Sequence, residues 1–412
     1  MSNMSTPAKT KPSAQALRPT PTKAPSGRIT QAEAVRQHNL AQVLAIVANN
    51  HKPLSRADIA QLIGVSRATA SALVDQLVEG NLLEELDAIR SGRAGRPATP
   101  VQVATHTVAG LGIQVDVDYL AVRALDLAGN VLADWLEPID LTGSDPVQVL
   151  AQLGQQTNQI AEQLISQSVR LTGAVLALPG IADSPLGPLR LAPNLRWSNV
   201  DAATLINLTA CQLLRIDNEA TLAARAELAA WASQPSTTPA EQTQRPRSFL
   251  YLSVGFGIGG AAILDGRTFP GNQGWAGEIG HVTVDPQGDA CTCGSSGCLE
   301  VLAGRRTLMQ IAGLDPSEPA EHLAQAAARG DAPALAALAQ AGWALGVALG
   351  SAFNLLDLPA AVIGGFPAPL MPQLGPLIAA ELKHRAMASR LVGKAPEILS
   401  PLGGPQSATT GA

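Results

Sequence analysis

The sequence has few aromatic residues, few charged residues and few cysteines. Aromatic side chains make up 3% and charged side chains 15% of the 412 residues, whereas 46% are hydrophobic, so any core must be built mainly from Ala, Leu and Val. This composition excludes a chain that is disordered throughout. Because single cores stop growing near about 250–300 residues, a chain of this length is expected to form two or three domains.

Long uninterrupted apolar segments are also lacking. Gly and Pro interrupt every candidate for a run of about 18 apolar residues, including Ala360–Leu377, and the first 30 residues carry no signal-peptide pattern. These absences predict a cytoplasmic protein without membrane contact. In that reducing compartment the four cysteines are expected to be metal ligands or core residues rather than disulfides.

Basic charge is concentrated at the N-terminal end. Residues 1–100 hold 12 Lys/Arg and 7 Asp/Glu, which gives 12 − 7 = +5, whereas the whole chain carries −5, so residues 101–412 carry −10. A polyanion is therefore expected to bind near the N-terminus, although a solvated basic tail is the alternative. Residues 1–28 contain no acid and almost no large apolar residue, and they are predicted to form a disordered tail.

Residues 36–86 alternate between helical patterns and tight turns. Apolar residues recur at helical spacing to about residue 50, Ser55 begins a capping pattern for a short second helix that ends at Gly64, and Ser66 caps a third helix that ends at Gly80. A short strand pattern follows. Two short helices joined by a tight turn and followed by a strand are typical of a winged helix-turn-helix, whose third helix enters the DNA major groove.

The exposed start of that third helix supplies candidate DNA contacts. Its side chains are short or cationic, which suits phosphates, base edges and a thymine methyl group; they are Ser66, Arg67, Ala68, Thr69 and Ser71. Further along, Arg93 and Arg96 lie in a Gly-rich strip that could follow the narrow minor groove. A three-helix oligomerisation module is the alternative for the helices, and a flexible linker is the alternative for the strip.

From residue 108 onward the pattern changes to strands that alternate with helices. This alternation predicts an α/β body with strands at 110–115, 121–127, 173–178, 249–254, 261–264 and 361–363 and helices at 147–168, 220–231, 320–328 and 334–356. The glycines at 255–260 fit the spacing of a dinucleotide-binding turn. That turn requires a helix next, and the strand pattern that follows favours a glycine hairpin instead.

The densest group of metal-ligating residues lies between 281 and 298. His281, Cys291, Cys293 and Cys298 supply one imidazole and three thiolates, a donor set that suits tetrahedral zinc, and Gly294 and Gly297 would let the backbone wrap the ion. Four protein ligands fill the coordination shell, so one structural zinc per chain is predicted. Buried free cysteines are the alternative.

Two carboxylates flank this group. Glu278 and Glu300 supply hydrogen-bond acceptors, and His281, fixed by the ion through one ring nitrogen, would direct the other nitrogen at a ligand hydroxyl. Such a set of groups suits a polyol such as a sugar. The alternative is that each carboxylate is an ordinary solvated surface group.

The run GWAGEIGHVTVDPQGDACTCGSSGCLE, preceded by GFGIGGA, resembles the signature of the ROK family of repressors and sugar kinases. VRQHNLAQVLAIV and SRADIAQLIGVSRATAS resemble the winged-helix part of the family's regulators, and LALPGIAD and LAPNLRWSN resemble its sugar-binding domain. The resemblance implies an actin-like ATPase fold of two lobes with a sugar in the cleft. We expect the lobes at 101–222 and 223–412, the second with the zinc site, after a winged helix-turn-helix and its Arg/Gly linker at 29–100.

The resemblance also implies individual residue roles. The family's sugar contacts fall on Asn194, Asn218, Glu278, His281 and Glu300, and its zinc ligands fall on the four residues already named. Glu219 stands at the position of the family's catalytic Asp, where it could still bind a sugar hydroxyl.

This sequence departs from the family's kinases at the phosphate loop. The kinases carry Asp-x-Gly-Gly-Thr there, whereas this chain has Gln114 at the Asp and acids with bulky neighbours, as far as Asp118, in place of the glycines. Phe256 replaces a small hydroxyl residue, Glu219 replaces the catalytic Asp, and the sequence stops at Ala412, where family members usually continue into a further helix.

These features together predict a sugar-responsive DNA-binding repressor that has lost kinase activity and is not an enzyme. Its expected partners are operator DNA, a sugar or sugar phosphate, and a second copy of the chain, because one recognition helix reads only a few base pairs. The alternatives are a zinc-containing, ATP-dependent sugar kinase and a scaffold that does not bind nucleic acid.

Overall fold

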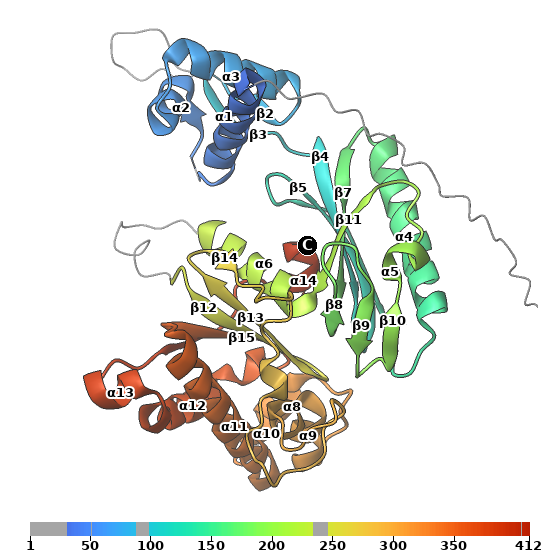
Figure 1. Cartoon of the computed structure of the whole chain (residues 1–412), viewed down its shortest axis with the longest axis vertical. Coiled ribbons are helices and arrows are strands. Elements are labelled where there is room, and N and C mark those ends of the chain that lie inside the picture. Colours follow the sequence, from blue (N-terminus) through green and yellow to red (C-terminus); the bar gives the residue numbers. More distant parts are fainter. Residues whose placement is uncertain (1–30, 51, 88–98, 234–245, 405) are drawn as a thin grey trace, which may run out of the picture.

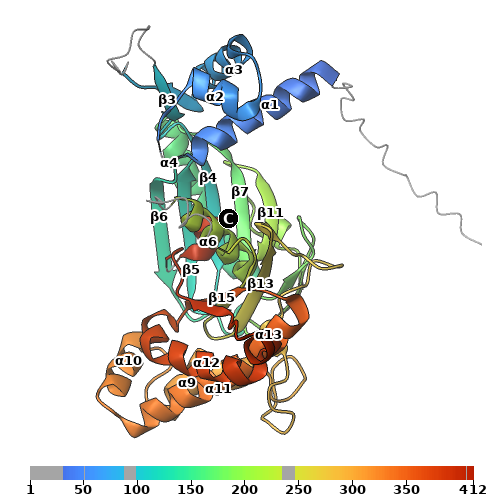
Figure 2. The same cartoon turned by 90° about the vertical axis from the view of Figure 1, so that its left-hand side faces the viewer.

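The computed structural model describes residues 31–50, 52–87, 99–233, 246–404 and 406–412. Figure 1 and Figure 2 show a helical N-terminal unit at one end of the long axis, two β-sheets in the middle and a group of helices at the other end. The predicted tail at 1–28 and the two candidate DNA contacts Arg93 and Arg96 lie outside the described residues.

Three helices form the N-terminal unit: α1 (Gln31–Ala48), α2 (Arg56–Ile63) and α3 (Arg67–Glu79). Ser55 and Asp58 form the predicted capping box of α2, and Gly64 ends that helix in the left-handed conformation with φ 71°. The core of this unit includes Val43, Val47 and Ile59, together with the buried residues of α3, which are Ala70, Leu73, Val74 and Leu77. α1 begins five residues before the start of its apolar pattern. The pattern misses these residues because the first two turns of the helix are exposed and need no apolar side chains.

A small sheet completes this unit in the order β1-β3-β2, with β1 (Leu54–Ser55), β2 (Leu83–Glu85) and β3 (Pro100–Val103). β2 and β3 pair in antiparallel fashion, with Leu83 opposite Val103. The Arg/Gly strip therefore connects two paired strands of the wing and does not follow a completed wing as a linker. The sequence interpretation missed β3 because the polar strip separates it from β2.

Two side chains join the N-terminal unit to the body. The Thr107 hydroxyl donates to the backbone oxygen of Asn81 at 2.7 Å, and the Arg170 guanidinium donates to the backbone oxygen of Gly80 at 3.3 Å. Both acceptors lie at the C-terminal end of α3. The turn that follows α3 is thus in direct contact with the start of the body.

The first sheet of the body has the strand order β11-β7-β4-β5-β6. Strands β4, β7 and β11 run parallel to one another. β5 pairs with β4 in antiparallel fashion, and β6 pairs with β5 in the same way. The elements are β4 (Val108–Val115), β5 (Tyr119–Asp126), β6 (Val131–Pro138), α4 (Pro146–Ser166), β7 (Arg170–Leu178) and β11 (Leu213–Asn218). A smaller sheet, β10-β9-β8, lies between β7 and β11 in the chain, with β8 (Ile181–Ala182), β9 (Leu189–Ala192), β10 (Trp197–Val200) and then α5 (Ala202–Leu205).

The second sheet has the order β14-β13-β12-β15-β16. β12 and β13 form the predicted glycine hairpin, with Val254 opposite Ile258, which excludes the dinucleotide-binding turn. The strands are β12 (Phe249–Val254), β13 (Ile258–Leu264), β14 (Arg267–Thr268), β15 (Ala360–Gly365) and β16 (Glu397–Leu399). Figure 1 shows α6 (Glu219–Ser233) and the C-terminal α14 (Ser407–Gly411) between the two sheets, and α14 packs on α6, β4 and β5.

The outer face of the second sheet is covered by helices, of which α11 (Ala332–Leu356) is the longest. Within the described ranges α11 is long and apolar enough to span a membrane by length and composition alone, but more than half of its apolar window is buried in the protein. Gly342, Gly346 and Gly350 let α12 (Met371–Arg385) approach its backbone closely. We therefore interpret α11 as a core helix. The neighbouring helices are α8 (Leu299–Ala303), α9 (Arg305–Ile311), α10 (Ala320–Ala328) and α13 (Met387–Val392).

Candidate functional site

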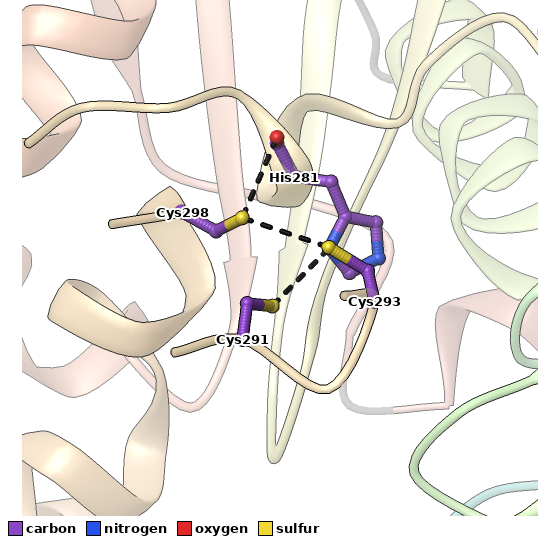
Figure 3. Close-up of side chains that lie close together, drawn as sticks. All are labelled: His281, Cys291, Cys293 and Cys298. Atoms are coloured by element: carbon purple, nitrogen blue, oxygen red, sulfur yellow. Dashed lines mark hydrogen bonds between the residues drawn. The ribbon is translucent and has the colours of Figure 1, made fainter. Parts of the chain in front are cut away.

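Four soft donor side chains gather between the short helix η1 (Ile279–His281) and the start of α8 (Figure 3). The ligand atoms of His281, Cys291, Cys293 and Cys298 all lie within 4.8 Å of one another. His281 Nδ1 is 3.8 Å from Cys291 Sγ, and Cys293 Sγ is 3.7 Å from Cys298 Sγ. The residues predicted from sequence spacing therefore come together in a group whose donors fit a structural metal ion.

The loop that carries these cysteines needs glycine at two positions. Gly294 and Gly297 have φ values of 93° and 64°, and a side chain at Gly297 would collide with the backbone of Asp285. Cys298 is fully buried and Cys293 is exposed. Burial, with the neighbouring thiols, raises the pKa of Cys298 to about 12, so this thiol becomes a thiolate only when a cation compensates its charge.

The second ring nitrogen of His281 faces away from the cysteines. His281 Nε2 lies 4.0 Å from Glu278 Oε2, whereas Nδ1 is directed at Cys291. A metal ion at the thiols would therefore fix the ring and leave Nε2 beside the Glu278 carboxylate. The pKa of Glu278 is raised by burial first and also by Glu300, while His281 lowers it.

All six candidate sugar contacts line one cavity between the first and second sheets of the body. They come from four separate regions of the chain, and they are Asn194, Asn218, Glu219, Glu278, His281 and Glu300. Backbone from the β12–β13 hairpin completes the wall at residues 255–259. The cavity is thus lined by amides, carboxylates, an imidazole and backbone groups that are able to bind several hydroxyls.

Asn218 is held in place by its position at the end of β11. Its Oδ1 accepts from the backbone N–H of Ala220 at 2.8 Å and of Thr221 at 3.3 Å, so the side chain caps α6. Its Nδ2 donates to the backbone oxygen of Gly180 at 3.1 Å. One Nδ2 hydrogen remains for a ligand, because an amide nitrogen carries two.

Glu300 and Asn194 meet over Gly257. Glu300 Oε2 accepts from the backbone N–H of Ile258 at 2.9 Å, which orients the carboxylate along the hairpin. A Cβ atom at Gly257 would lie 2.6 Å from Asn194 Nδ2 and 2.7 Å from Glu300 Oε2. Glycine at this position therefore lets both polar groups approach the same backbone.

Glu219 is the first residue of α6 and lines the cavity. Its Oε2 has no hydrogen-bond partner in the described part of the chain. Burial, and then the charges of Asp116, Glu278 and Glu300, raise the pKa of Glu219 well above its ordinary value. This environment favours the neutral form of the carboxyl, and a cation or hydrogen-bond donor placed beside it would favour the ionised form.

The turn between β4 and β5 occupies the place of the kinases' phosphate loop. The backbone N–H of Asp116 donates to the backbone oxygen of Tyr119 at 2.9 Å, and that of Val117 donates to Asp116 Oδ1 at 2.7 Å. Burial and the neighbouring Asp118 raise the pKa of Asp116 to about 6. The turn thus presents carboxyl groups and spends both of these N–H groups internally, the opposite of what a phosphate needs.

The N-terminal turn of α3 presents the predicted DNA contacts. Ser66, Arg67, Ala68 and Thr69 are exposed, and Ser71 is partly exposed. The Ser66 hydroxyl accepts from the backbone N–H of Thr69 at 3.1 Å and lies 2.9 Å from the Thr69 hydroxyl, so these two hydroxyls also serve the helix cap. No side-chain hydrogen bond of this cap, among the described residues, involves Arg67 or Ala68.

Comparison with protein families identifies both parts of the chain. A model of the ROK family matches residues 110–411, and a model of the MarR family matches residues 41–94. The first match covers well over half of the chain. This chain belongs to the ROK family.

The relatives of this ROK protein include named repressors. The xylose repressor of Caldicellulosiruptor bescii is 31% identical over 278 residues, which are 67% of this chain and 66% of that protein. The chain therefore spans just under two thirds of that relative's length. The DNA-binding transcriptional repressor Mlc of Escherichia coli is 24% identical over 366 residues, with 86% of this chain and 87% of that protein covered.

Solved structures show the same fold. A ROK family transcriptional regulator described as a homologue of E. coli Mlc superposes with a TM-score of 0.71 at 24% identity, covering 92% of this chain and 96% of that one. A ROK glucokinase from Streptomyces griseus gives a TM-score of 0.57 at 20% identity, covering 74% and 97%. The architecture is thus a winged helix-turn-helix of MarR type followed by a ROK body of the actin-like kinase fold, as predicted.

Sequence reasoning missed the role of Arg305, at the start of α9. Its Nη1 lies 3.0 Å from Asp118 Oδ2, and its guanidinium group lies 5.0 Å from the ring centre of Phe256 and 5.3 Å from that of Phe366. The sequence offered a partial signal, since Phe256 departs from the kinase pattern. It offered none for the pairing, because Asp118 and Arg305 are 187 positions apart.

Proposed function

We propose that this ROK protein is a sugar-responsive, DNA-binding repressor of carbohydrate-metabolism genes. The observation that carries the proposal is the convergence of six polar side chains on one cavity in a body that shares its chain with a winged helix-turn-helix. The contacts between the end of α3 and the first sheet support a direct mechanical connection between the two parts.

The effector is proposed to be a sugar or sugar phosphate that binds through Asn194, Asn218, Glu219, Glu278, His281 and Glu300. The carboxylates accept from ring hydroxyls, and the Asn218 amide and His281 Nε2 complete the polar set. Relatives carry the names xylose repressor and N-acetylglucosamine repressor, so xylose and N-acetylglucosamine are the first sugars to test.

The metal is proposed to be one structural zinc ion per chain. Three thiolates and one imidazole are the soft donors that zinc prefers, and four protein ligands leave no open position. Zinc at His281, Cys291, Cys293 and Cys298 would hold the loop between the two sugar-contacting carboxylates, Glu278 and Glu300.

DNA contact is proposed for Ser66, Arg67, Ala68, Thr69 and Ser71 in the major groove and for Arg93 and Arg96 in the wing. The exposure of the first turn of α3 supports the former. Two copies of the chain would place two recognition helices in successive half-sites, so the protein is proposed to act as a homodimer, and as a transcription factor in the cytoplasm.

Kinase activity is proposed to be lost. The β4–β5 turn presents carboxyl groups in place of the kinases' glycines and uses the backbone N–H groups of Asp116 and Val117 internally, which supports the loss of a phosphate site. One observation favours the alternative, a zinc-containing ATP-dependent sugar kinase: Glu219 lies in the sugar cavity with an oxygen that has no protein partner in the described residues.

The deciding experiment measures binding of the full chain to DNA from upstream of its own gene by fluorescence anisotropy, with and without a panel of sugars and sugar phosphates. We expect specific DNA binding that one sugar changes by roughly fivefold or more. Glu300→Gln should remove the sugar effect and keep DNA binding, whereas the exposed Glu321→Gln serves as a matched control. Specific DNA binding that no sugar alters, or no DNA binding at all, would contradict the proposal.

A further inference from the structure

A second, larger cavity lies beside the sugar cavity. Its volume is about 500 Å³, within the range of sites for small organic ligands. The β4–β5 turn forms one wall, and Arg305 with the segment that contains Phe366 forms the other. The two cavities share Asp116, Glu219, Ser253, Gly255 and Phe256, but most of the second lining belongs to it alone, so it is able to hold a ligand of its own.

The charge of this lining excludes an anion. Four acids face the cavity, Asp116, Asp118, Glu219 and Glu321, against one cation, Arg305. Arg305 is already paired with Asp118, and its Nη2 donates to the backbone oxygens of Ser317 and Glu318, so only its buried Nε–H has no partner in the described residues. A nucleotide would therefore add its phosphates to an acidic wall without a free cation to receive them.

The inner wall also holds hydrogen-bond acceptors that no protein group in the described ranges satisfies. Gln114 is 2% exposed; its Nε2 donates to Asp116 Oδ2 at 3.0 Å, but its Oε1 has no donor. Glu219 Oε2 has no partner either. A buried acceptor without a donor costs free energy, and both residues line the cavity, so a ligand that donates hydrogen bonds at this end would remove that cost.

Aromatic and proline side chains give the opposite wall apolar surface. Phe256 and Phe366 hold the Arg305 guanidinium group between them at 5.0 Å and 5.3 Å from their ring centres, and both rings line the cavity. Pro319 and Pro369 add apolar surface. An aliphatic chain can pack on these side chains while its charged end faces the acids.

We propose that this cavity binds a small organic amine, with its primary ammonium or guanidinium group at Gln114 Oε1, Asp116 and Glu219 and its aliphatic part against Phe256 and Phe366. Ammonium carries three donors and no acceptor, which matches a wall of acceptors. The proposal does not depend on the sugar or DNA functions, because it concerns binding alone.

Binding should strengthen as pH rises. An ammonium group favours ionised carboxyls, so its binding releases protons from groups whose pKa is raised, as burial and neighbouring acids do for Asp116, to about 6, and for Glu219. The titratable and charged groups around them are Asp118, Tyr119, Glu278, Glu300, Arg305 and Glu321. Affinity for the amine should therefore increase between about pH 5.5 and pH 8.

The test is calorimetry on the full chain with its metal bound, using putrescine and agmatine as probes and 1,4-butanediol and ATP as comparisons. We expect at least about tenfold tighter binding of one amine than of the uncharged diol, the difference that one charge-assisted hydrogen bond makes. ATP that binds as tightly as the amine, or amines that bind no better than the diol at moderate salt, would overturn the proposal.

Two variants locate the site. Gln114→Met keeps the side-chain volume and removes the buried acceptor, so amine affinity should fall about tenfold, whereas Glu397→Gln, at an exposed acid of β16 outside the cavity lining, should leave it unchanged. Ala368→Leu fills part of the cavity without touching a charge and should also weaken binding. The circular dichroism spectrum and the thermal unfolding midpoint verify that each variant is folded; folded variants that keep full amine affinity would place the amine elsewhere and refute the site.

Discussion

Arg305 and Asp118 join the two halves of the ROK body, with Arg305 Nη1 3.0 Å from Asp118 Oδ2. Arg305 begins α9, which only Gly304 separates from the helix that carries Glu300, and Asp118 lies in the turn between β4 and β5. The same arginine donates its backbone N–H to the oxygen of Gly255 in the glycine hairpin at 3.0 Å. One residue thus contacts the elements that carry the candidate sugar contacts and the sheet that adjoins the N-terminal unit.

Replacing Arg305 should therefore uncouple sugar binding from DNA binding. In Arg305→Ala the sugar affinity measured by calorimetry should stay within a few-fold, while the sugar-induced change in DNA affinity should shrink by roughly fivefold or more, because the two halves lose their charged contact. Arg305→Lys should restore part of the effect. Arg306→Ala, at the exposed neighbour, is the matched control. An unchanged sugar response in Arg305→Ala would show that coupling takes another route.

Cys293 should be needed for metal binding and for the sugar site. Cys293→Ser should lower the zinc content of the purified protein well below one per chain and weaken sugar binding, because the ion holds the loop between Glu278 and Glu300. Elemental analysis and calorimetry measure both effects. The fourth cysteine, Cys211, lies outside the cluster, so Cys211→Ser should keep both properties. A Cys293→Ser protein with native sugar affinity would make the metal incidental to the sugar site.

Arg67 should contribute to specific DNA recognition. It is exposed at the first position of α3, and a base-reading arginine typically contributes about 1–3 kcal/mol of discrimination. Anisotropy titrations of Arg67→Ala on operator and scrambled DNA should show this loss on the operator only. The double variant Arg93→Ala/Arg96→Ala should weaken binding to both and reduce the salt dependence. Equal losses on both DNAs for Arg67→Ala would assign Arg67 to phosphate contact instead.

The elements that sequence reasoning predicted are those with local signals. Three examples are the buried apolar residues of α3, the capping box at Ser55 and the metal-ligand spacing from Cys291 to Cys298. Each lies within one short segment, so its periodicity or spacing can be recognised directly in the sequence. The gathering of Asn194 and Asn218 with Glu300 followed only from the family resemblance. The Arg305–Asp118 pair and the β2–β3 pairing depend on contacts between distant segments, which leave no periodic trace.

Asp116 should make the protein less stable as pH rises. Its pKa is 3.8 ordinarily and about 6 in the fold, so the stability it contributes is fully present below about pH 4 and is lost as pH rises through about 6. The loss is at most about 3 kcal/mol. Asp116→Asn should therefore raise the thermal unfolding midpoint at pH 7.5 and leave it nearly unchanged at pH 4, and the new amide could also donate to Gln114 Oε1 after a flip of that side chain.

Asp140 provides a control of opposite sign for this experiment. The backbone N–H and the hydroxyl of Thr142 lower the pKa of Asp140, so its ionised form stabilises the fold above about pH 4, and this contribution is lost as pH falls through the lowered pKa. Asp140→Asn should therefore lower the unfolding midpoint slightly at pH 7.5. A destabilised Asp116→Asn protein at pH 7.5 would contradict the conclusion that burial of the ionised Asp116 carboxylate destabilises the fold.

The chain should show no useful sugar kinase activity. Phosphoryl transfer depends on positioning and on charge stabilisation, and the β4–β5 turn offers acids in place of free N–H groups. Even if Glu219 acted as a base, general-base help is worth about 10²–10⁴-fold and cannot replace a phosphate site. Sugar binding should therefore be measurable by calorimetry without ATP, and Glu219→Gln should alter that binding or the DNA response. Sugar-dependent ADP release at roughly 1–100 s⁻¹, abolished by Glu219→Gln and kept by Glu321→Gln, would establish a kinase instead.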